Sequence, residues 1–514
     1  MKFLVPFLIG CLLSCPVGAA VPSQDDLPDI GSPSSAALSR DHEEQIGREI
    51  MRMLRDAGQI LDDPEITEYV QTVGDRLVGQ SQETDYEFRF FVVDDPHINA
   101  FALPGGYIGV NSGLVLASET ESELAGVIAH EIAHVTQKHI ARRVEAGSRA
   151  GLVSTAALLA AILVGAATGA SPDALQGAIA ITQGTALQQQ INFTRSNESE
   201  ADRVGIGILA SAGFDPHGMP AFFETMSRRQ GLAMSGIPEF ILTHPAPPDR
   251  IAESRARAAK YPDVEPEDSP EYELTRARIR VLSAKNSSGA LQEIRSLQKS
   301  EDTGWSPDAL SYGEAIALMR AGRPDEAVSL LAGLRDRNQN VIAYHSALGQ
   351  AQIQSNQPRE AMDTFRNAIA LFPRNVPLTI RYSQALMRFG EPQYAHELLL
   401  DLLNNVPPTP DQAHLIALAA SAAGDTADAY YYMSEYHVLN GNLPLAADQL
   451  RLALAVPDLD EVQRSRFQAR LDLIRENLPE RRRRSVFDDP EPDTTDVGPV
   501  STGASLAPPA RGAA

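Results

Sequence analysis

The sequence predicts two successive parts: an α+β domain, mostly helical with a small sheet, and an all-α solenoid after it. Apolar residues recur with helical spacing over 41–80, and short β-prone segments lie between 86 and 110. Alanines recur every 34 residues from about 305 onward, a period typical of helical repeats. With 514 residues, the chain is long enough to bury two such cores.

Residues 1–20 are expected to be a cleaved secretory signal peptide. Lys2 precedes an apolar run, and small residues at 17–20 provide a cleavage site. An N-terminal membrane anchor is the less favoured alternative, because Pro6 and Pro16 interrupt a run that is already short for a membrane span.

Both cysteines of the chain, Cys11 and Cys15, lie inside this segment. The mature chain is therefore expected to have no disulfide and to be held together by packing. Each cysteine follows residues that loosely resemble a bacterial lipoprotein box, so lipidation at Cys11 or Cys15 is a further, less favoured alternative.

The charge of the chain argues against one class of partner. The formal net charge is −23 and the isoelectric point is near 4.9. Nucleic acid is not expected as a partner because its phosphates would be repelled. The charge does not identify any other partner.

Composition divides the chain after residue 20 into five segments. A connector rich in Pro and Ser comes first, and the last segment has too little apolar content to fold alone. The expected boundaries are 21–40 for the linker, 41–260 for the α+β domain, 261–304 for a helical connector, 305–476 for the repeats and 477–514 for a disordered tail.

A small sheet is expected directly before the most distinctive motif of the sequence. Residues 86–93 predict one strand, and 101–103 and 107–110 predict two more around Pro104-Gly105-Gly106. The exposed edge of such a strand can pair with an extended peptide, which fixes the peptide backbone and leaves sequence preference loose.

Residues 151–170 contain no charged side chain. Their length makes them a candidate membrane span. Ala and Gly dominate the segment, which makes insertion marginal, so a buried or groove-covering helical hairpin is favoured. Contact of 151–170 with a membrane surface stays open.

The repeats are defined by alanines that follow Gly-containing or polar turns. The four that share one register are Ala327, Ala361, Ala395 and Ala429, and Ala446 and Ala453 belong to a further unit. The 34-residue period is that of tetratricopeptide helix pairs. Such solenoids use a curved face to bind peptides or proteins.

The motif HEIAH contains His130, Glu131 and His134. In a helix the two histidines lie about 40° apart around the axis, so both imidazoles project from one face at a spacing that suits one Zn²⁺. Glu131 lies where it can take a proton from a metal-bound water as general base. The motif indicates a zinc hydrolase, with a purely structural helix as the alternative.

A catalytic zinc needs three protein ligands and an open position. His139 lies about 140° around the helix from His134 and is expected to point elsewhere. Downstream, Glu198 and Asp202 share a helix face, whereas Glu200 is rotated by about 200° from Glu198. We therefore expect Glu198 to be the third ligand. Asp202 would orient a ligating histidine or donate a proton, and both roles stay open.

These motifs together resemble a known family. HEIAH, the E-x-x-A-D pattern at 198–202, NAFALPGG before them and Thr-His-Pro at 243–245 look like the M48 peptidases, gluzincin-type zinc endopeptidases. The signal peptide and the tetratricopeptide repeats resemble the periplasmic branch of that family. The resemblance covers about 41–460, nearly the whole mature chain.

The resemblance implies a function and a set of roles. One Zn²⁺ per chain would be held by His130, His134 and Glu198, with Glu131 as general base and Asp202 as proton donor. The protein would be a periplasmic metalloendopeptidase that degrades unfolded or misassembled polypeptides in outer-membrane protein quality control, with chaperone-like activity. The repeats would contact outer-membrane assembly machinery.

His244 supports a separate hypothesis. Pro245 biases it to an extended conformation, and it follows the ligand helix in a loop, so it can approach the open zinc position as a regulatory fourth ligand. A loop histidine that packs nearby without touching metal is the alternative.

Two rival functions stay open. One is a chaperone or scaffold that acts through its repeats and keeps a vestigial protease site, although the intact zinc motif speaks against it. The other is a membrane-embedded M48 enzyme that uses 151–170 as a span.

Overall fold

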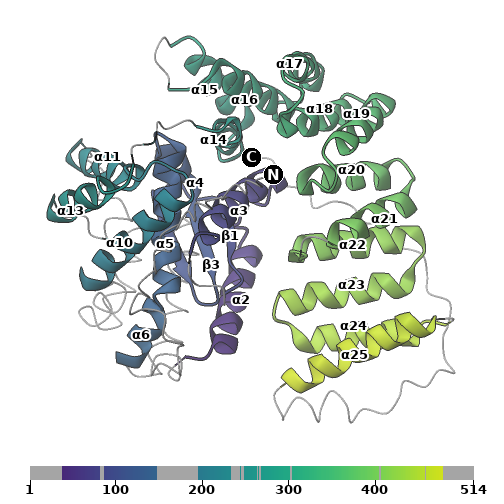
Figure 1. Ribbon diagram of the computed structural model, residues 1–514. Helices are drawn as coiled ribbons and strands as arrows, with labels where there is room; N and C mark the ends of the chain where they lie inside the picture. The colour runs from purple at the N-terminus through teal and green to yellow at the C-terminus, as the bar shows by residue number, and fades with distance from the viewer. Residues whose placement is uncertain are drawn as a thin grey trace, which may run out of the picture.

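The computed structural model shows a helical domain with a three-stranded sheet, joined to an arc of antiparallel helices (Figure 1). The described residues are 38–81, 86–146, 195–232, 244, 248–262, 264, 268–300, 304–404, 407–457 and 459–478. The expected signal peptide with its two cysteines, the apolar segment 151–170, and nearly all of the linker and tail lie outside the described residues.

The N-terminal part carries the sheet. Its elements are α2 (Arg40–Asp56), α3 (Pro64–Val78), β1 (Arg89–Val93), β2 (Ala100–Leu103), β3 (Tyr107–Asn111), α4 (Ser112–Ala117), α5 (Glu121–Thr136), α6 (His139–Ala146), α10 (Arg195–Ser211), α11 (Gly218–Leu232) and α13 (Pro248–Ala258). The helical periodicity over 41–80 thus corresponds to α2 and α3.

The C-terminal part is all helical. Its elements are α14 (Pro270–Leu282), α15 (Ser287–Leu297), α16 (Pro307–Arg320), α17 (Pro324–Arg337), α18 (Ile342–Gln354), α19 (Pro358–Leu371), α20 (Val376–Arg388), α21 (Pro392–Leu403), α22 (Pro410–Ala423), α23 (Thr426–Leu439), α24 (Leu443–Ala455) and α25 (Glu461–Asn477). In Figure 1, helices α15 to α19 cross the top of the molecule and α20 to α25 descend beside the sheet domain.

The sheet has the strand order β1-β3-β2, with β1 parallel and β2 antiparallel to β3. The expected hairpin between β2 and β3 is present. Gly105 and Gly106 close it with φ angles of 81° and 83°, which lie in the left-handed region where only glycine is unstrained. A Cβ on Gly105 would also lie 2.7 Å from Cα of Glu44, so this turn requires glycine.

Each face of the sheet covers a separate core. Ile108 and Val110 pack with apolar residues of α3, α5, α10 and α11, whereas Tyr107 packs on the opposite face with residues of α2 and α6. Helix α5 lies inside the first core, and all its residues from Glu121 to Val135 are buried. This helix is therefore held on every side.

The alanine register predicted for the repeats holds for most of its members. Ala327, Ala361 and Ala395 are fully buried, as are Ala446 and Ala453. Ala429 is only partly buried, and Ala427 is buried in its place. The small side chains let successive helices pack closely, but the register predicted by the period shifts in α23.

Four charged residues, two of them buried and two half-buried, join the two parts of the molecule, and we call them the junction cluster: Asp63, Glu65, Arg278 and Arg381. Arg278 on α14 donates to both oxygens of Asp63, each at 2.7 Å, and Nη2 of Arg381 on α20 lies 2.8 Å from the Glu65 carboxylate. Burial opposes the charge on Glu65, but the two guanidinium groups outweigh it and hold the pKa of Glu65 well below its usual value. Ser346 of α18 also donates to Glu65.

Within the described part of the chain, the helices include none with the length and hydropathy that a membrane crossing requires.

We predict that Arg278→Met lowers the free energy of unfolding by about 3–5 kcal/mol, because it leaves the buried carboxylates of the junction cluster short of positive charge. Chemical denaturation at pH 7 measures this loss. Arg337→Met is the matched control. Its partner Asp308 is exposed, as Arg337 itself is, and such pairs contribute at most about 1 kcal/mol.

The pH dependence gives a second check on the same interaction. Because the pKa of Glu65 is lower in the folded state than in the unfolded chain, the stability it provides is complete above its unfolded pKa, about 4.3, and is lost as the pH falls through the folded value. The deficit of Arg278→Met should therefore shrink in acid. A deficit equal to that of Arg337→Met at pH 7 would contradict the stabilising role of the cluster.

Candidate metal centre

Helix α5 presents the first two candidate ligands. The Thr120 hydroxyl accepts a hydrogen bond from the Glu123 backbone at 3.2 Å, and this cap fixes where the helix begins. His130 and His134 then lie one turn apart on the same face. Both are fully buried, and their Nε2 atoms are 3.0 Å apart.

The prediction that His139 is not a ligand agrees with the structure, but the helix geometry assumed for it was wrong. Helix α5 ends at Thr136, Lys138 adopts a left-handed φ of 55°, and α6 begins anew at His139. Because the helix does not continue, the imidazole of His139 returns to α5, and its Nδ1 lies 2.8 Å from Nδ1 of His134. His139 does not join the ligand cluster, but it contacts one of its members.

Helix α10 delivers the acidic residues because it packs against α5 without a side chain at Gly205. A Cβ on Gly205 would lie 3.1 Å from the Ala129 carbonyl oxygen and from the His130 backbone nitrogen. This close approach places Glu198 and Asp202, both buried on the same side of α10, against His130.

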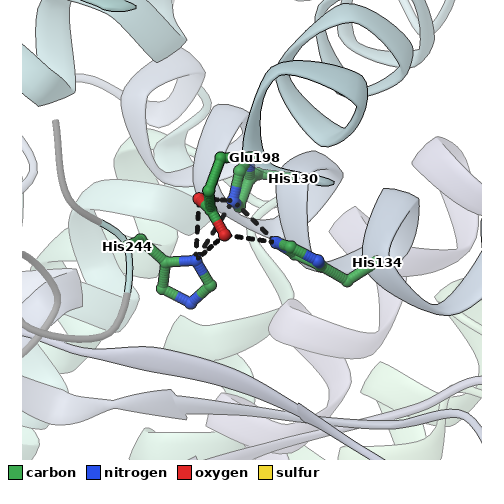
Figure 2. A group of neighbouring side chains, drawn as sticks. All are labelled: His130, His134, Glu198 and His244. Carbon is green, nitrogen blue, oxygen red and sulfur yellow. Dashed lines mark hydrogen bonds and ion pairs between the residues drawn. The ribbon is translucent and has the colours of Figure 1, made fainter. Parts of the chain in front are cut away.

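Four donor atoms converge from three segments that are distant in sequence. They belong to His130, His134, Glu198 and His244, and they all lie within 4.8 Å of one another (Figure 2). Nε2 of His130 lies 3.4 Å from Nδ1 of His244 and 3.5 Å from Glu198 Oε2, and Nε2 of His134 lies 3.6 Å from Glu198 Oε1.

These spacings fit a tetrahedral metal ion. Bonds of about 2.0–2.1 Å to nitrogen and oxygen require donors about 3.3–3.4 Å apart at the corners of a tetrahedron. The donor set of three imidazoles and a carboxylate is also one that zinc accepts. Burial opposes the charge on Glu198, but His244 and His130 outweigh it and hold the pKa of Glu198 well below its usual value. The carboxylate is therefore ionised, as a ligand must be.

Asp202 contacts His130 on the side opposite to the cluster. Its Oδ1 lies 3.0 Å from Nδ1 of His130. Arg250 on α13 donates to both carboxylate oxygens, each at 2.7 Å, and Ser254 adds a bond at 3.3 Å. Burial would raise the pKa of Asp202, but the hydrogen bonds from Arg250 and His130 outweigh it and lower the pKa to about 2.

His244 engages two functional groups at once. Its Nδ1 lies 3.2 Å from Glu198 Oε2, within the ligand cluster, and its Nε2 lies 3.5 Å from the Glu131 carboxylate. The side chain is buried. His244 therefore supplies the fourth donor atom of the cluster and also contacts the candidate general base.

The sequence patterns missed the role of Arg250. Besides holding Asp202, its Nη1 lies 2.9 Å from Glu198 Oε2, and its guanidinium stacks over Phe223. No spacing rule links Arg250 to the acids of α10. A signal did exist, since two acidic residues predicted to be buried beside a metal require a cation nearby.

Comparison with known proteins agrees with this geometry. The model of peptidase family M48 matches residues 64–258, and a tetratricopeptide repeat model matches 352–419. The chain is 34% identical over 478 residues to the beta-barrel assembly-enhancing protease of Escherichia coli. The matched region covers 92% of this chain and 96% of that protein. The chain belongs to peptidase family M48 and is a metalloendopeptidase.

Other relatives carry related names. The beta-barrel assembly-enhancing protease of Yersinia pestis is 33% identical over 475 residues, covering 91% of this chain and 96% of that protein. A mitochondrial metalloendopeptidase of Schizosaccharomyces pombe is 35% identical over 188 residues, covering 36% of this chain and 51% of that protein. The resemblance inferred from the motifs is confirmed, as is the predicted fold of an M48 domain followed by tetratricopeptide repeats.

We predict that Gly205→Val weakens metal binding by about 10–100-fold, a range measured for changes that displace groups around a metal site. The added side chain must push α10 away from the α5 backbone and take Glu198 with it. Competition with a chromophoric chelator measures the affinity.

Gly207→Val is the matched control on the same helix. A Cβ there would meet only the Tyr261 hydroxyl, at 3.2 Å, and the change in helix propensity is the same as for Gly205→Val. Equal metal affinity in the two variants would show that the close helix contact does not set the geometry of the donor atoms.

Proposed function

We propose that His130, His134 and Glu198 hold one catalytic Zn²⁺ per chain and that the protein cleaves unfolded or misassembled polypeptides. The observation that carries this proposal is the buried set of donor atoms with tetrahedral spacing in a member of a metallopeptidase family. When bound, zinc supplies a Lewis acid that polarises a peptide carbonyl and increases the acidity of water.

In this proposal Glu131 is the general base. It follows His130 on the buried helix, and its carboxylate faces the fourth corner of the tetrahedron, which His244 takes. When His244 withdraws, the carboxylate can accept a proton from the attacking water and return it to the leaving amine.

Asp202 is proposed to orient His130 rather than to donate a proton. A carboxyl group whose pKa is lowered to about 2 is ionised near neutral pH, so it carries no proton to give. An ionised carboxylate beside Nδ1 keeps the proton on that nitrogen and leaves Nε2 of His130 free to bind metal.

Strand β2 is proposed to hold the substrate. It packs against α5 and is an edge strand of the sheet within the described residues. The bond from Asn111 to Asn99, at 3.0 Å, sets the antiparallel ladder, so the backbone groups of the half-buried Ala102 point away from β3. An extended polypeptide can pair with these groups without regard to its side chains, which suits unfolded substrates.

We further propose a periplasmic role in outer-membrane protein quality control, with chaperone-like activity. The relatives that match along nearly the whole chain are named beta-barrel assembly-enhancing proteases, which supports this role. The repeats supply a surface for a protein partner, such as outer-membrane assembly machinery. We assign the peptidase domain to 41–260, the connector to 261–304 and the repeats to 305–476.

The variant Glu131→Gln tests the catalytic proposal. We expect it to bind as much zinc as the wild type, because Glu131 is not a ligand, and to lose at least about 100-fold in cleavage rate, because the general base is gone. Zinc content by mass spectrometry and cleavage of an unfolded protein by electrophoresis give the two readouts.

Glu145→Gln makes the same chemical change at an exposed position on α6 and should leave both readouts unchanged. Equal cleavage by the wild type and Glu131→Gln would overturn the proposal and favour a chaperone or scaffold.

His244→Ala tests the regulatory ligand. If His244 closes the site in about nine molecules out of ten, its removal raises the competent fraction and the cleavage rate about tenfold. The exposed His42 provides the control variant His42→Ala, for which no change is expected. No rise in cleavage by His244→Ala would argue against a blocking role.

A further inference from the structure

We propose that His139 and Glu200 act as a relay that fixes the protonation pattern of His134, so that this ligand presents a bare Nε2 to the metal. The inference rests on the proposed zinc site and assigns positioning roles to two residues outside it. Both residues had been set aside by the sequence patterns, His139 because of its angle on an assumed helix and Glu200 because it points away from Glu198.

The relay is a continuous line of polar contacts. Nδ1 of His134 lies 2.8 Å from Nδ1 of His139, and Nε2 of His139 lies 3.1 Å from Glu200 Oε2. Arg142 donates to the same Glu200 oxygen at 2.8 Å. The line thus runs from the ligand on α5 through the first residue of α6 to the carboxylate on α10.

The contact between His139 and Glu200 determines which nitrogen of His139 carries the proton. An ionised carboxylate only accepts hydrogen bonds, so Nε2 of His139 must carry a proton in order to bond to Glu200. In the neutral ring the other nitrogen, Nδ1, then has a free lone pair.

The same reasoning determines which nitrogen of His134 carries its proton. Two imidazole nitrogens 2.8 Å apart need one proton between them, and Nδ1 of His139 is the acceptor, so Nδ1 of His134 is the donor. His134 therefore keeps its proton on Nδ1, which leaves the lone pair of Nε2 pointing into the cluster of donor atoms.

The two histidine ligands are thus oriented by different means. His130 contacts the carboxylate of Asp202 directly, whereas His134 contacts a neutral imidazole that stands between it and the carboxylate of Glu200. Both arrangements keep Nδ1 protonated and Nε2 bare. A carboxylate, carbonyl or similar acceptor behind each ligating histidine raises ligand basicity and holds the ring in place.

The turn between α5 and α6 makes the relay possible. His139 lies five residues after His134, a spacing that would separate the two rings on an unbroken helix. The left-handed Lys138 ends the helix and brings His139 back against α5. An apolar side chain at this position could fill the same space, but it could not accept a hydrogen bond from His134. We therefore infer that His139 is needed for its Nδ1 atom.

The test compares two replacements of His139 in the full-length protein. In His139→Asn the amide oxygen stands near the place of Nδ1 and can accept from His134, whereas His139→Leu fills the space without an acceptor. We expect His139→Leu to weaken zinc binding by about 10–100-fold and His139→Asn to recover most of that loss. Chelator competition measures affinity, and thermal unfolding of the metal-free protein reports folding.

Glu200 supplies a second pair of variants at a partly exposed position, where folding is less at risk. Glu200→Gln keeps an oxygen that accepts from His139 and should bind zinc nearly as the wild type does. Glu200→Ala removes the acceptor and should weaken binding. Nitrogen-15 NMR of the imidazoles in the zinc-loaded protein should show the proton of His139 on Nε2 in the wild type and a mixture of tautomers in Glu200→Ala.

The outcomes separate this inference from the proposed function. A wild-type protein that fails to bind zinc removes the metal site itself. If the wild type binds zinc and His139→Leu binds it equally, the relay is wrong and the zinc site stands. Equal weakening in His139→Leu and His139→Asn would also overturn the relay, because it would show that only the shape of the imidazole matters. His345→Leu, at a buried histidine of α18, controls for the loss of a buried ring and should leave zinc affinity unchanged.

Discussion

The close contact between α5 and α10 is the constraint on which the site depends. Histidines one turn apart on a helix are only a pair of donors, and they need a carboxylate that the local sequence does not supply. Gly205 removes the side chain that would keep the helices apart, and the carboxylates of α10 then reach His130 without distortion of either helix. The contact is made inside the main core, where dense packing allows little adjustment, so the packing itself fixes the positions of the candidate ligands.

Local patterns were predicted well, because one helix pair or one hairpin suffices to produce each of them. The alanine period identified the repeats, and Pro104-Gly105-Gly106 identified the hairpin, since both depend on neighbours in sequence. The parallel pairing of β1 with β3 had no such signal, because β2 lies between these two strands in the sequence although they are neighbours in the sheet. Ala429 departs from its register for a similar reason: its burial depends on how α23 packs between α22 and α24, which the period does not encode.

The site illustrates the same limit. His130, His134 and Glu198 were predicted from the spacing of their motifs and from the family resemblance, and the structure brings their donor atoms together. His139 was correctly expected not to be a ligand, but its contact with His134 was missed. The helical angle assumed a helix that continues, and a lysine at 138 gives no sequence signal for a left-handed residue. Arg250 was missed because it lies far along the chain from Asp202, and only the electrostatic need of a buried carboxylate connects the two.

The junction cluster has a consequence for how a captured protein meets the active site. Arg381 belongs to the repeats and Glu65 to the helix that begins beside the sheet, so the two parts are bonded to each other directly and not only through the connector. A polypeptide that bound to the repeats would then be presented to the candidate site from a fixed direction. Its effective concentration there would follow from the geometry of the solenoid, and it would not fall off with linker length as it does for domains on a flexible tether.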